Sequence, residues 1–497
     1  MLLTMMMCVM RGTQDASHCR LDLLMTRNDV IVWHLRETAN SSGPRYRSLA
    51  SCLTTLIAAG HIRVGQKLPG ERELADALGV SRTTMVQAYR TLKELGWVES
   101  RTGRGTFASR PAGERVTRMV DWVETAFETI GATQESCPID FATAAPSPLP
   151  ELRGAIAGCI DDAVRLAGQG AHYSQGLPEL REWVAQWYAS RGLPTRSEEI
   201  VITTGAQQAL ALICRLFVRP KGTVVLESPT YLGALDQMRS RSAHILSVQT
   251  GDAGIDVDQL TESVTKYSPG LMYTMSGCHS ITGTTMSKAH HELLVDLVSR
   301  TSMIVVDDDV YAGMVGSEGT PTSLLASADP ELPIITIGGV GKLLWDGLRV
   351  GWLRAPRGIA DRLARLKSVE DLGTSIVAQL ISLDLLHDYQ SICDSRTQEA
   401  SSRRVLAQSL LRATIPEWDW NETSEGWSIW IRFPEGLSAT DFAALAKRRG
   451  VVIAAGPTFS ADGSSDDRLR LVFHRPVGEI EQGIQRLANA WQEFQIS

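Results

Sequence analysis

The chain has 497 residues, of which 43% are hydrophobic and 21% charged. This length and composition suit two or three folded domains and exclude a globally disordered chain. No run approaches the roughly 18 apolar residues of a membrane span. The apolar start, Met1–Met10, lacks the basic region of a secretory signal peptide. We therefore expect no membrane partner and no cleaved leader.

The eight cysteines are scattered, and none forms a CxxC pair. This spacing fits neither a zinc ribbon nor a disulfide framework, so we expect a reducing, cytoplasmic setting and no bound metal. The net charge of −7 is unevenly spread: residues 41–110 carry 11 Lys and Arg against five Asp and Glu, which is +6 and leaves −13 for the remainder. A basic segment on an acidic body predicts that one part of the chain contacts nucleic acid.

Changes in pattern divide the chain into four parts. Residues 1–42 have no sustained periodicity and are expected to form a poorly ordered arm. Residues 43–110 form a small helical domain that ends in a Gly-rich hairpin, and residues 111–136 form a linker with a helix at Val116–Ile130. Residues 137–497 form an α/β body whose smaller C-terminal lobe begins at about residue 391.

Two short helices joined by a tight turn dominate the basic segment. Glu71–Leu78 forms the first helix, Gly79 and Val80 form the turn, and Ser81 caps a second helix that runs to about Leu95. The apolar face of the second helix carries Met85, Ala88, Tyr89, Leu92 and Leu95, and its polar face carries Thr83, Gln87, Arg90 and Glu94. This arrangement is typical of a helix-turn-helix, whose second helix enters the major groove of DNA.

A basic hairpin follows the second helix. Two short strands at 96–100 and 105–107 bracket Arg101, Gly103 and Arg104, which predicts a wing that lies along a phosphate backbone. A helical hairpin with a solvated polar face is the alternative, but the caps, the turn, the basic tip and the local charge agree on DNA binding. The side chains expected to contact DNA are those of Ser81, Arg82, Thr83, Thr84, Gln87, Arg101 and Arg104. The runs LPGERELA, GVSRTT and GRGTF closely resemble the winged helix of the GntR regulators.

Short apolar strands separated by helical stretches characterise the body. The expected strands are Ile200–Thr203, Thr223–Leu226, Ile245–Val248, Leu271–Tyr273, Met303–Val306, Ile334–Ile337 and Val350–Leu353. Helical patterns such as Gln207–Phe217 and His290–Arg300 lie between them, which predicts a mostly parallel sheet. The small lobe is expected to be α+β, with a helix at Arg396–Ala413 and strands at Trp427–Arg432, Val451–Ala454 and Arg468–Phe473.

A lysine in a glycine-rich turn, Lys342, carries the sharpest signal in the body. A nucleotide-binding P-loop is excluded, because Thr336 stands where its first glycine should be and Leu343 where Ser or Thr should bind magnesium. A lysine at one strand end close to an aspartate at another is what pyridoxal phosphate requires. The amine forms a Schiff base, and the carboxylate keeps the pyridine nitrogen protonated.

The aspartate partner is expected in the run Asp307–Asp309, directly after a strand. Alone, these acidic residues could equally be metal ligands or a solvated strand end, but the lysine favours the cofactor. We assign Asp308 to the pyridine nitrogen and Tyr311 to the ring phenolate oxygen. We expect Lys342 to be the catalytic residue.

The remaining cofactor contacts follow from strand ends and charge. Gly205, Ala206 and Gln207 join a strand to a helix N-terminus, whose free N–H groups favour phosphate. Arg349 neutralises the same phosphate, Tyr231 lies over the cofactor ring, and Arg470 of the small lobe clamps a substrate or effector carboxylate.

These motifs, in this order, resemble the fold-type I aminotransferases of class I/II. The matching runs are YSQGLPELR, TTGAQQAL, ESPTY, DDDVY, GK…GLRVGW and RLRLVF. A GntR winged helix fused to such a body resembles the MocR regulators, bacterial transcription factors. The resemblance implies pyridoxal 5'-phosphate on Lys342, an amine or amino-acid effector that remodels the site, and head-to-tail homodimers that bind double-stranded operator DNA.

The sequence departs from the aminotransferase pattern at several positions. Gly339 and Gly341 stand where serines usually donate to the cofactor phosphate, and Ser280 replaces a common Asn-Pro pair. The loop at Tyr173–Gly176 is about two residues shorter than the usual form. We therefore expect cofactor binding with little or no turnover, as in a sensor. A working aminotransferase with an accessory DNA-binding module is the alternative. A DNA-binding protein with a cofactor-free body is a third hypothesis.

Overall fold

A computed structural model describes residues 45–58, 62, 66–101, 105–109, 138–168, 172–312, 329–422 and 425–496. Contacts within the chain divide it into two compact units, Met1–Thr133 and Gln134–Ser497. The predicted arm, residues 1–42, and the predicted linker helix, Val116–Ile130, lie outside the described residues. No helix among the described residues is long and apolar enough to cross a membrane.

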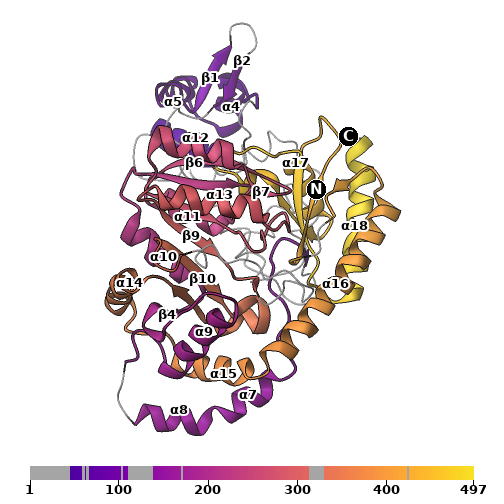
Figure 1. Ribbon diagram of the computed structural model, residues 1–497. Coiled ribbons are helices and arrows are strands. Elements are labelled where there is room, and N and C mark those ends of the chain that lie inside the picture. The colour runs from indigo at the N-terminus through magenta and orange to yellow at the C-terminus, as the bar shows by residue number, and fades with distance from the viewer. Residues whose placement is uncertain are drawn as a thin grey trace. The chain divides into compact units, whose positions relative to one another are not determined.

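The described part of the first unit contains three helices and a two-stranded hairpin (Figure 1). Its elements are α3 (Arg45–Ala58), α4 (Glu71–Leu78), α5 (Arg82–Glu94), β1 (Val98–Arg101) and β2 (Gly105–Ala108). Gly79, at φ +65°, ends α4 in the left-handed conformation that glycine tolerates best. The predicted apolar face of α5 is buried at Met85 and Leu92, but Leu95 is 56% exposed. The expectation that Leu95 is buried was therefore wrong: Leu95 is the C-cap residue, just beyond the last helical residue, Glu94.

Among the described residues, an eight-stranded sheet forms the centre of the body. Its order is β4 (Ile200–Thr203), β11 (Gly351–Arg354), β10 (Ile334–Gly339), β9 (Ile304–Asp308), β8 (Leu271–Thr274), β5 (Thr223–Ser228), β6 (His244–Gly251) and β7 (Gly254–Ile255). The five strands from β10 to β6 are parallel, whereas β11 is antiparallel to both of its neighbours and β7 is antiparallel to β6. The mostly parallel sheet predicted from the sequence is confirmed, with β11 as its main exception.

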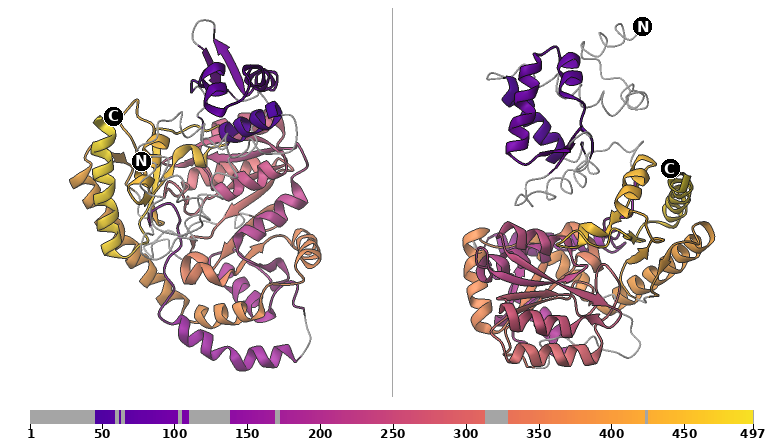
Figure 2. Two further views of the ribbon diagram at one scale, coloured as in Figure 1. Left: turned by 180° about the vertical axis from the view of Figure 1, so that it is seen from behind. Right: turned by 90° about the horizontal axis from the view of Figure 1, so that it is seen from above.

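Helices cover both faces of this sheet, as the views in Figure 2 show. One face packs against α10 (Ala206–Phe217), α11 (Leu232–Ser240) and α14 (Arg357–Glu370). The other packs against α9 (Pro178–Ser190), α12 (Val257–Tyr267), α13 (Lys288–Ser299) and α15 (Ile376–Leu386), and α15 in turn contacts α7 (Leu152–Gly158) and α8 (Ile160–Ala167). Val201 lies in one core and Ile202 in the other, because successive strand side chains point to opposite faces. The near-continuous apolar strands of the sequence are explained by this double coverage.

Among the described residues, the small lobe has a four-stranded antiparallel sheet and three helices. Its strands are β12 (Asp419–Trp420), β13 (Ser428–Arg432), β16 (Arg468–Val472) and β15 (Ala454–Ala455), and its helices are α16 (Tyr389–Thr414), α17 (Ala439–Arg448) and α18 (Val477–Ile496). The long helix begins seven residues before the predicted Arg396. The predicted strand Val451–Ala454 is divided: β14 (Val451–Val452) pairs with β3 (Ile139–Asp140), and Ala454 pairs with Arg470. The start of the body is therefore tied to the small lobe.

Candidate functional site

The candidate site of the body lies where several strands of the central sheet end. Asp308 ends β9, Lys342 follows β10, and the Gly205 turn follows β4. Ligands of open α/β sheets commonly bind outside the carboxyl ends of the parallel strands. Residues that are far apart in the sequence are brought together at this edge.

Lys342 lies in a short π-helical turn, Gly341–Trp345. Its ammonium group donates a hydrogen bond to the carbonyl oxygen of Ala144. Burial lowers the pKa of Lys342, and the charges that act on the amine are Asp346, Arg470, Asp308 and Arg349. A lysine whose pKa is lowered by burial is a better nucleophile at neutral pH, because more of it is uncharged.

Asp308 is held in a buried network. Its Oδ2 accepts a hydrogen bond of 2.6 Å from the Tyr273 hydroxyl, and its Oδ1 accepts one of 3.2 Å from the Val310 N–H. Burial raises the pKa of Asp308 to about 6, although both hydrogen bonds act in the opposite direction. A cationic partner would recover the cost of burying this carboxylate. We expected Asp308 after the strand, but it is the last residue of β9.

The three adjacent aspartates have different partners. Asp307 Oδ1 accepts hydrogen bonds from the Ser276 hydroxyl at 2.8 Å and from its N–H at 3.3 Å. Asp309 forms a buried ion pair with Arg191. Of the three, only Asp308 therefore belongs to the cluster of charged residues around Lys342, which also contains Asp346, Arg349 and Arg470. The described residues contain no group of three or more His, Cys, Asp or Glu side chains that could hold a metal.

The turn before α10 is shaped for close approach. Gly205 has φ +77°, and a Cβ built on it would lie 2.8 Å from Nη2 of Arg349. The Arg349 guanidinium therefore lies against this turn, next to the free N–H groups of Ala206 and Gln207 at the start of α10. A cation beside a helix N-terminus is suited to phosphate. Arg349 is oriented by Asp346, whose Oδ1 accepts a hydrogen bond of 3.1 Å from Nη1.

The two glycines that replace serines have different surroundings. A Cβ at Gly341 would lie 2.7 Å from Oδ1 of Asp346, the carboxylate that orients Arg349. A Cβ at Gly339 would lie 3.3 Å from the Val350 carbonyl oxygen and 4.0 Å from the Ala206 nitrogen. Asp346 thus takes the room that a side chain at Gly341 would need. The resulting Asp346–Arg349 pair was not foreseen from the sequence.

Two tyrosines line the same cluster. The Tyr231 hydroxyl donates a hydrogen bond of 3.0 Å to Oε1 of Gln207, and its side chain is 38% exposed. The position of the Tyr231 ring requires a glycine at residue 233, because a Cβ on Gly233 would lie 2.5 Å from that ring. Tyr311 is buried, which raises its pKa to about 12, and Arg470 acts on it in the opposite direction.

Arg470 brings the small lobe into the site. It lies on β16 opposite Trp430 of β13, with its guanidinium 5.8 Å from the Phe459 ring centroid. Its side chain is buried, burial lowers its pKa, and among the described residues its Nε has no hydrogen-bond partner. A buried cation with an unsatisfied donor is costly, and a ligand carboxylate would satisfy it.

These residues fit pyridoxal phosphate and an anionic ligand beside it. The buried amine of Lys342, the carboxylate of Asp308 and the Gly205–Arg349 cradle provide the three kinds of contact that the cofactor needs. When bound, the cofactor supplies an electron-withdrawing ring next to the amine. The sequence interpretation missed Tyr273 and Asp346; the position of Tyr273 at the end of a strand next to β9 was the available signal.

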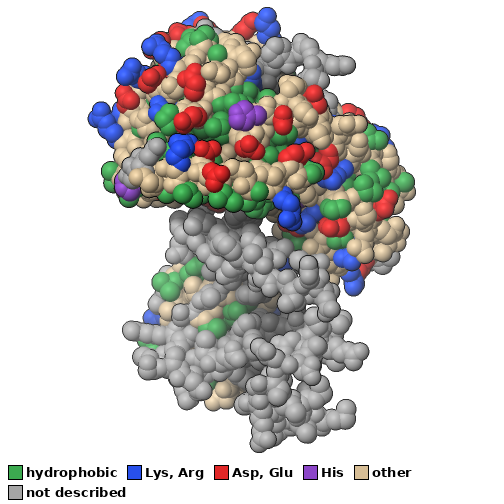
Figure 3. Space-filling model, turned by 90° about the horizontal axis from the view of Figure 1, so that it is seen from below, with side chains coloured by type: hydrophobic (Ala, Val, Ile, Leu, Met, Phe, Trp, Pro, Cys, Tyr) green, Lys and Arg blue, Asp and Glu red, His purple; other side chains and the backbone are tan. Residues whose placement is uncertain are grey.

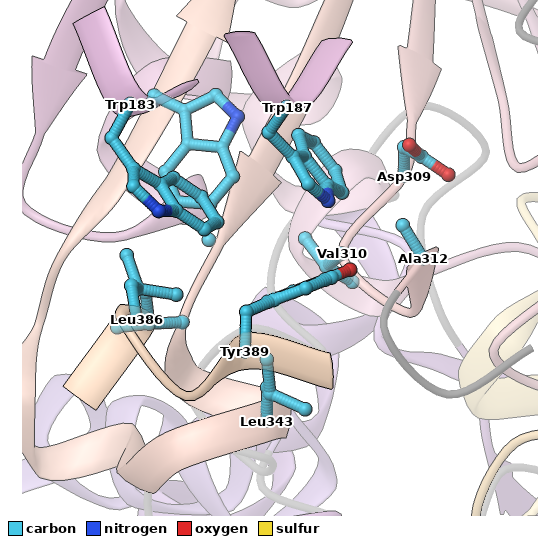
Figure 4. Close-up of a pocket in the computed structure, with 11 residues that line it drawn as sticks. Trp183, Trp187, Asp309, Val310, Ala312, Leu343, Leu386 and Tyr389 are labelled. Atoms are coloured by element: carbon cyan, nitrogen blue, oxygen red, sulfur yellow. The ribbon is translucent and has the colours of Figure 1, made fainter. Parts of the chain in front are cut away.

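A separate pocket lies beside Asp309. Trp183, Trp187 and Tyr389 line it together with Leu386 (Figure 4). Its volume is about 20 Å³, which is room for about one water molecule. The guanidinium of Arg191 lies 4.5 Å from the Trp187 ring centroid. This aromatic cluster therefore shields the Arg191–Asp309 ion pair and belongs to the core.

Five of the predicted DNA-binding residues, from Ser81 to Gln87, lie at the start of α5. The Ser81 hydroxyl accepts a hydrogen bond of 3.1 Å from the Thr84 N–H, which caps the helix, and lies 2.7 Å from the Thr84 hydroxyl. Arg82 and Thr83 are exposed beside this cap, and Gln87 is half-buried one turn later. Arg104 and the side chain of Arg101 lie outside the described residues.

The wing is attached to a basic residue that the sequence interpretation overlooked. The Leu68 N–H donates to the Thr106 carbonyl oxygen at 2.9 Å, and the Ala108 N–H donates to that of Gln66 at 2.9 Å. Lys67, between them, is exposed, and its Cε would lie 2.9 Å from a Cβ on Gly105. Lys67 therefore adds a positive charge at the base of the wing. On the face of the body seen in Figure 3, by contrast, acidic and basic side chains are interspersed.

Comparison with known proteins agrees with both parts of this description. Residues 164–487 match the family described as aminotransferase class I and II, and residues 45–108 match the bacterial regulatory proteins of the gntR family. The 2-aminoadipate transaminase of Thermus thermophilus is 30% identical over 373 residues, which cover 73% of this chain and 92% of the relative. The HTH-type transcriptional regulator YisV of Bacillus subtilis is 27% identical over 92% of this chain and 98% of its own length.

Further similarities extend to a regulator and to a solved structure. The probable rhizopine catabolism regulatory protein MocR of Rhizobium meliloti is 25% identical over 82% of this chain and 85% of its own length. The crystal structure of LysN, an α-aminoadipate aminotransferase of Thermus thermophilus complexed with N-(5'-phosphopyridoxyl)-L-leucine, matches with a TM-score of 0.67. It is 26% identical and covers 76% of this chain and 99% of that structure. The chain therefore belongs to the aminotransferase class I and II family and joins that body to a gntR-family winged helix, which is the architecture of the MocR-type regulators.

Proposed function

We propose that this chain is a pyridoxal phosphate-dependent transcription regulator that reads double-stranded DNA with its winged helix and senses an amine or amino acid in its body. One observation carries the proposal: a single chain combines a capped helix with a wing and a buried lysine–aspartate–arginine cluster. Its relatives are named both as transcriptional regulators and as aminotransferases, which supports the same combination.

Arg470 is the residue that would detect the effector. It extends from the small lobe toward a cluster whose other members belong to the large lobe, and its Nε lacks a partner among the described residues. A carboxylate-bearing amine on this site would contact both lobes at once. Such a ligand favours the arrangement in which both contacts are made, and differential affinity of this kind is what a sensor requires.

A working aminotransferase is the second candidate, and the retained Lys342–Asp308 pair favours it. The enzyme and the sensor differ in whether a keto acid is formed from the amino acid and released. Steady release of a keto acid from an amino acid, abolished by Lys342→Ala, would support the enzyme. Spectral changes on adding an amino acid without such release would support the sensor.

The first experiment is an absorption spectrum of the protein purified with pyridoxal phosphate, recorded before and after borohydride. We expect a band near the visible edge, and borohydride should reduce the C=N bond to Lys342 and make the attachment irreversible. A panel of amines and amino acids is then screened for spectral shifts and for changes in DNA affinity. A flat spectrum, with no cofactor on Lys342 by peptide mapping, would contradict the proposal.

The proposal includes a head-to-tail homodimer, as the resemblance to MocR regulators implies. Sedimentation of the full chain should give a dimer mass with and without operator DNA. A monomer that binds DNA with full affinity would contradict this part alone.

A further inference from the structure

The turn after β4 is connected to an ion pair on another element, and the lysine of that pair is buried. The Thr204 N–H donates a hydrogen bond of 2.7 Å to Oε1 of Gln208, and Nε2 of Gln208 donates one of 2.7 Å to Oδ2 of Asp371. Asp371 accepts two further hydrogen bonds from Lys367, at 2.7 and 2.8 Å. The turn after β4 is thus joined in three steps to the C-terminal end of α14.

The ion pair at the end of this chain is strongly held. Lys367 is fully buried, and the side chain of Asp371 is 24% exposed. Burial acts against ionisation of Asp371, but the hydrogen bonds from Lys367 and Gln208 outweigh it and lower the pKa of the carboxyl. Removing Asp371 would leave the charge of buried Lys367 uncompensated, so the loss of this pair is costly.

The segment after α14 is fixed from both sides. The Gly373 N–H donates 3.0 Å to Oδ1 of Asp371, and Leu372 has φ +60°, a conformation unusual for leucine. Farther on, Nε2 of Gln379 donates 2.9 Å to the Thr374 carbonyl oxygen. Its Oε1 accepts 2.7 Å from the Leu177 N–H. The anchor is therefore part of a hydrogen-bonded frame rather than a lone contact.

The turn itself needs external support. Gly205 has a positive φ, and glycine loses more conformational freedom on folding than any other residue. A Cβ at Gly351 would lie 2.6 Å from the Gly205 carbonyl carbon. The neighbouring strand therefore has no room at this position for a side chain that could support the turn. N–H groups bind an anion best when they are already aimed at it before the anion arrives. The hydrogen bond from Thr204 to Gln208 provides such aiming.

We propose that Lys367, Asp371 and Gln208 are positioning residues that hold the Thr204–Gln207 turn ready for the cofactor's phosphate group. This inference deepens the proposed function and rests on it. None of the three needs to touch the cofactor, because they act through the backbone of the turn. The consequence is specific: their loss weakens recognition of the phosphate and leaves recognition of the pyridine ring unchanged.

The test compares two probes that differ only in the phosphate, pyridoxal 5'-phosphate and pyridoxal. Asp371→Asn and Gln208→Leu are each compared with the natural chain by equilibrium binding. We expect pyridoxal 5'-phosphate to bind about tenfold more weakly in both variants and pyridoxal to bind as before. The matched control is Glu199→Gln, which removes the charge that faces buried Arg354 at the other end of β4, 3.8 Å away. It should leave the ratio of the two affinities unchanged.

A second measurement uses the protein without cofactor. Hydrogen exchange of the peptide that contains Thr204 should become faster in Asp371→Asn and Gln208→Leu but not in Glu199→Gln. Equal weakening of both probes, or unchanged exchange at Thr204, would overturn the inference. If the natural chain binds neither probe, the proposed function fails, whereas faster exchange at Thr204 in the two variants would still support the positioning of the turn.

Discussion

The winged helix and the cofactor cluster are assembled in opposite ways. In the winged helix, the cap, the recognition helix and the wing follow one another within Ser81–Ala108. In the body, the Lys342 cluster takes residues from the turn after β4, from β9, from the segment after β10 and from β16, and they are spread from Gly205 to Arg470. A site built from local contacts can be read directly from spacing. A site built at the edge of a sheet requires the strand order before its residues can be grouped.

The largest expected effect that separates the two units is that of Lys342→Ala. Covalent attachment of pyridoxal phosphate should be lost completely, because no other described lysine belongs to the cluster. Affinity for DNA in the absence of effector should be unchanged. The measurements are borohydride trapping and DNA titration, with Lys288→Ala, a largely exposed lysine, as the control. Loss of DNA affinity in Lys342→Ala would show that the two units do not act separately.

A change of Asp308 should reveal the charge of the cofactor ring. Because the pKa of Asp308 is raised to about 6, its carboxyl is neutral below that pH and charged above it. Cofactor affinity should therefore rise as the pH increases through about 6, since only the carboxylate pairs with a protonated pyridine nitrogen. In Asp308→Asn we expect affinity lower by about 2 kcal/mol at neutral pH and a flatter pH profile. The exposed Asp296→Asn serves as the control, and an identical profile in Asp308→Asn would exclude this role.

On the DNA side, Arg82→Ala should weaken operator binding by about 1–3 kcal/mol without changing the cofactor spectrum. Arg82 is exposed at the N-terminal turn of α5, whereas Lys93 is exposed at the other end of the same helix. Lys93→Ala is therefore the matched control. The measurement is DNA affinity at several salt concentrations. Equal losses in the two variants would indicate only a general charge effect rather than docking by the start of α5.

The smallest expected effect is that of the helix cap. Ser81→Ala removes the acceptor of the Thr84 N–H and should lower the free energy of unfolding of the first unit by about 1 kcal/mol. Ser100→Ala, at an exposed position of β1, should have no measurable effect. Thermal and denaturant unfolding of the full chain would measure both variants. A stable Ser81→Ala unit with reduced DNA affinity would assign Ser81 to DNA contact instead of capping.

The sequence by itself determined the elements and their chemistry. Apolar strand patterns, the Ser81 cap and the Lys342 turn depend on residues that are close in the chain, where period and capping rules apply. The sequence could not foresee that Asp307, Asp308 and Asp309 would take three separate sets of partners, since this depends on which strands lie beside β9.

Only the tertiary structure decided which distant side chains share an environment. The Tyr273–Asp308 hydrogen bond and the link from Thr204 through Gln208 to Asp371 join residues whose types alone predict nothing specific. The last of these spans 163 positions in the chain between Gln208 and Asp371. Hydrogen bonds of this kind form because the packing of α10 and α14 on one face of the sheet brings their ends together, and residue spacing carries no record of that packing.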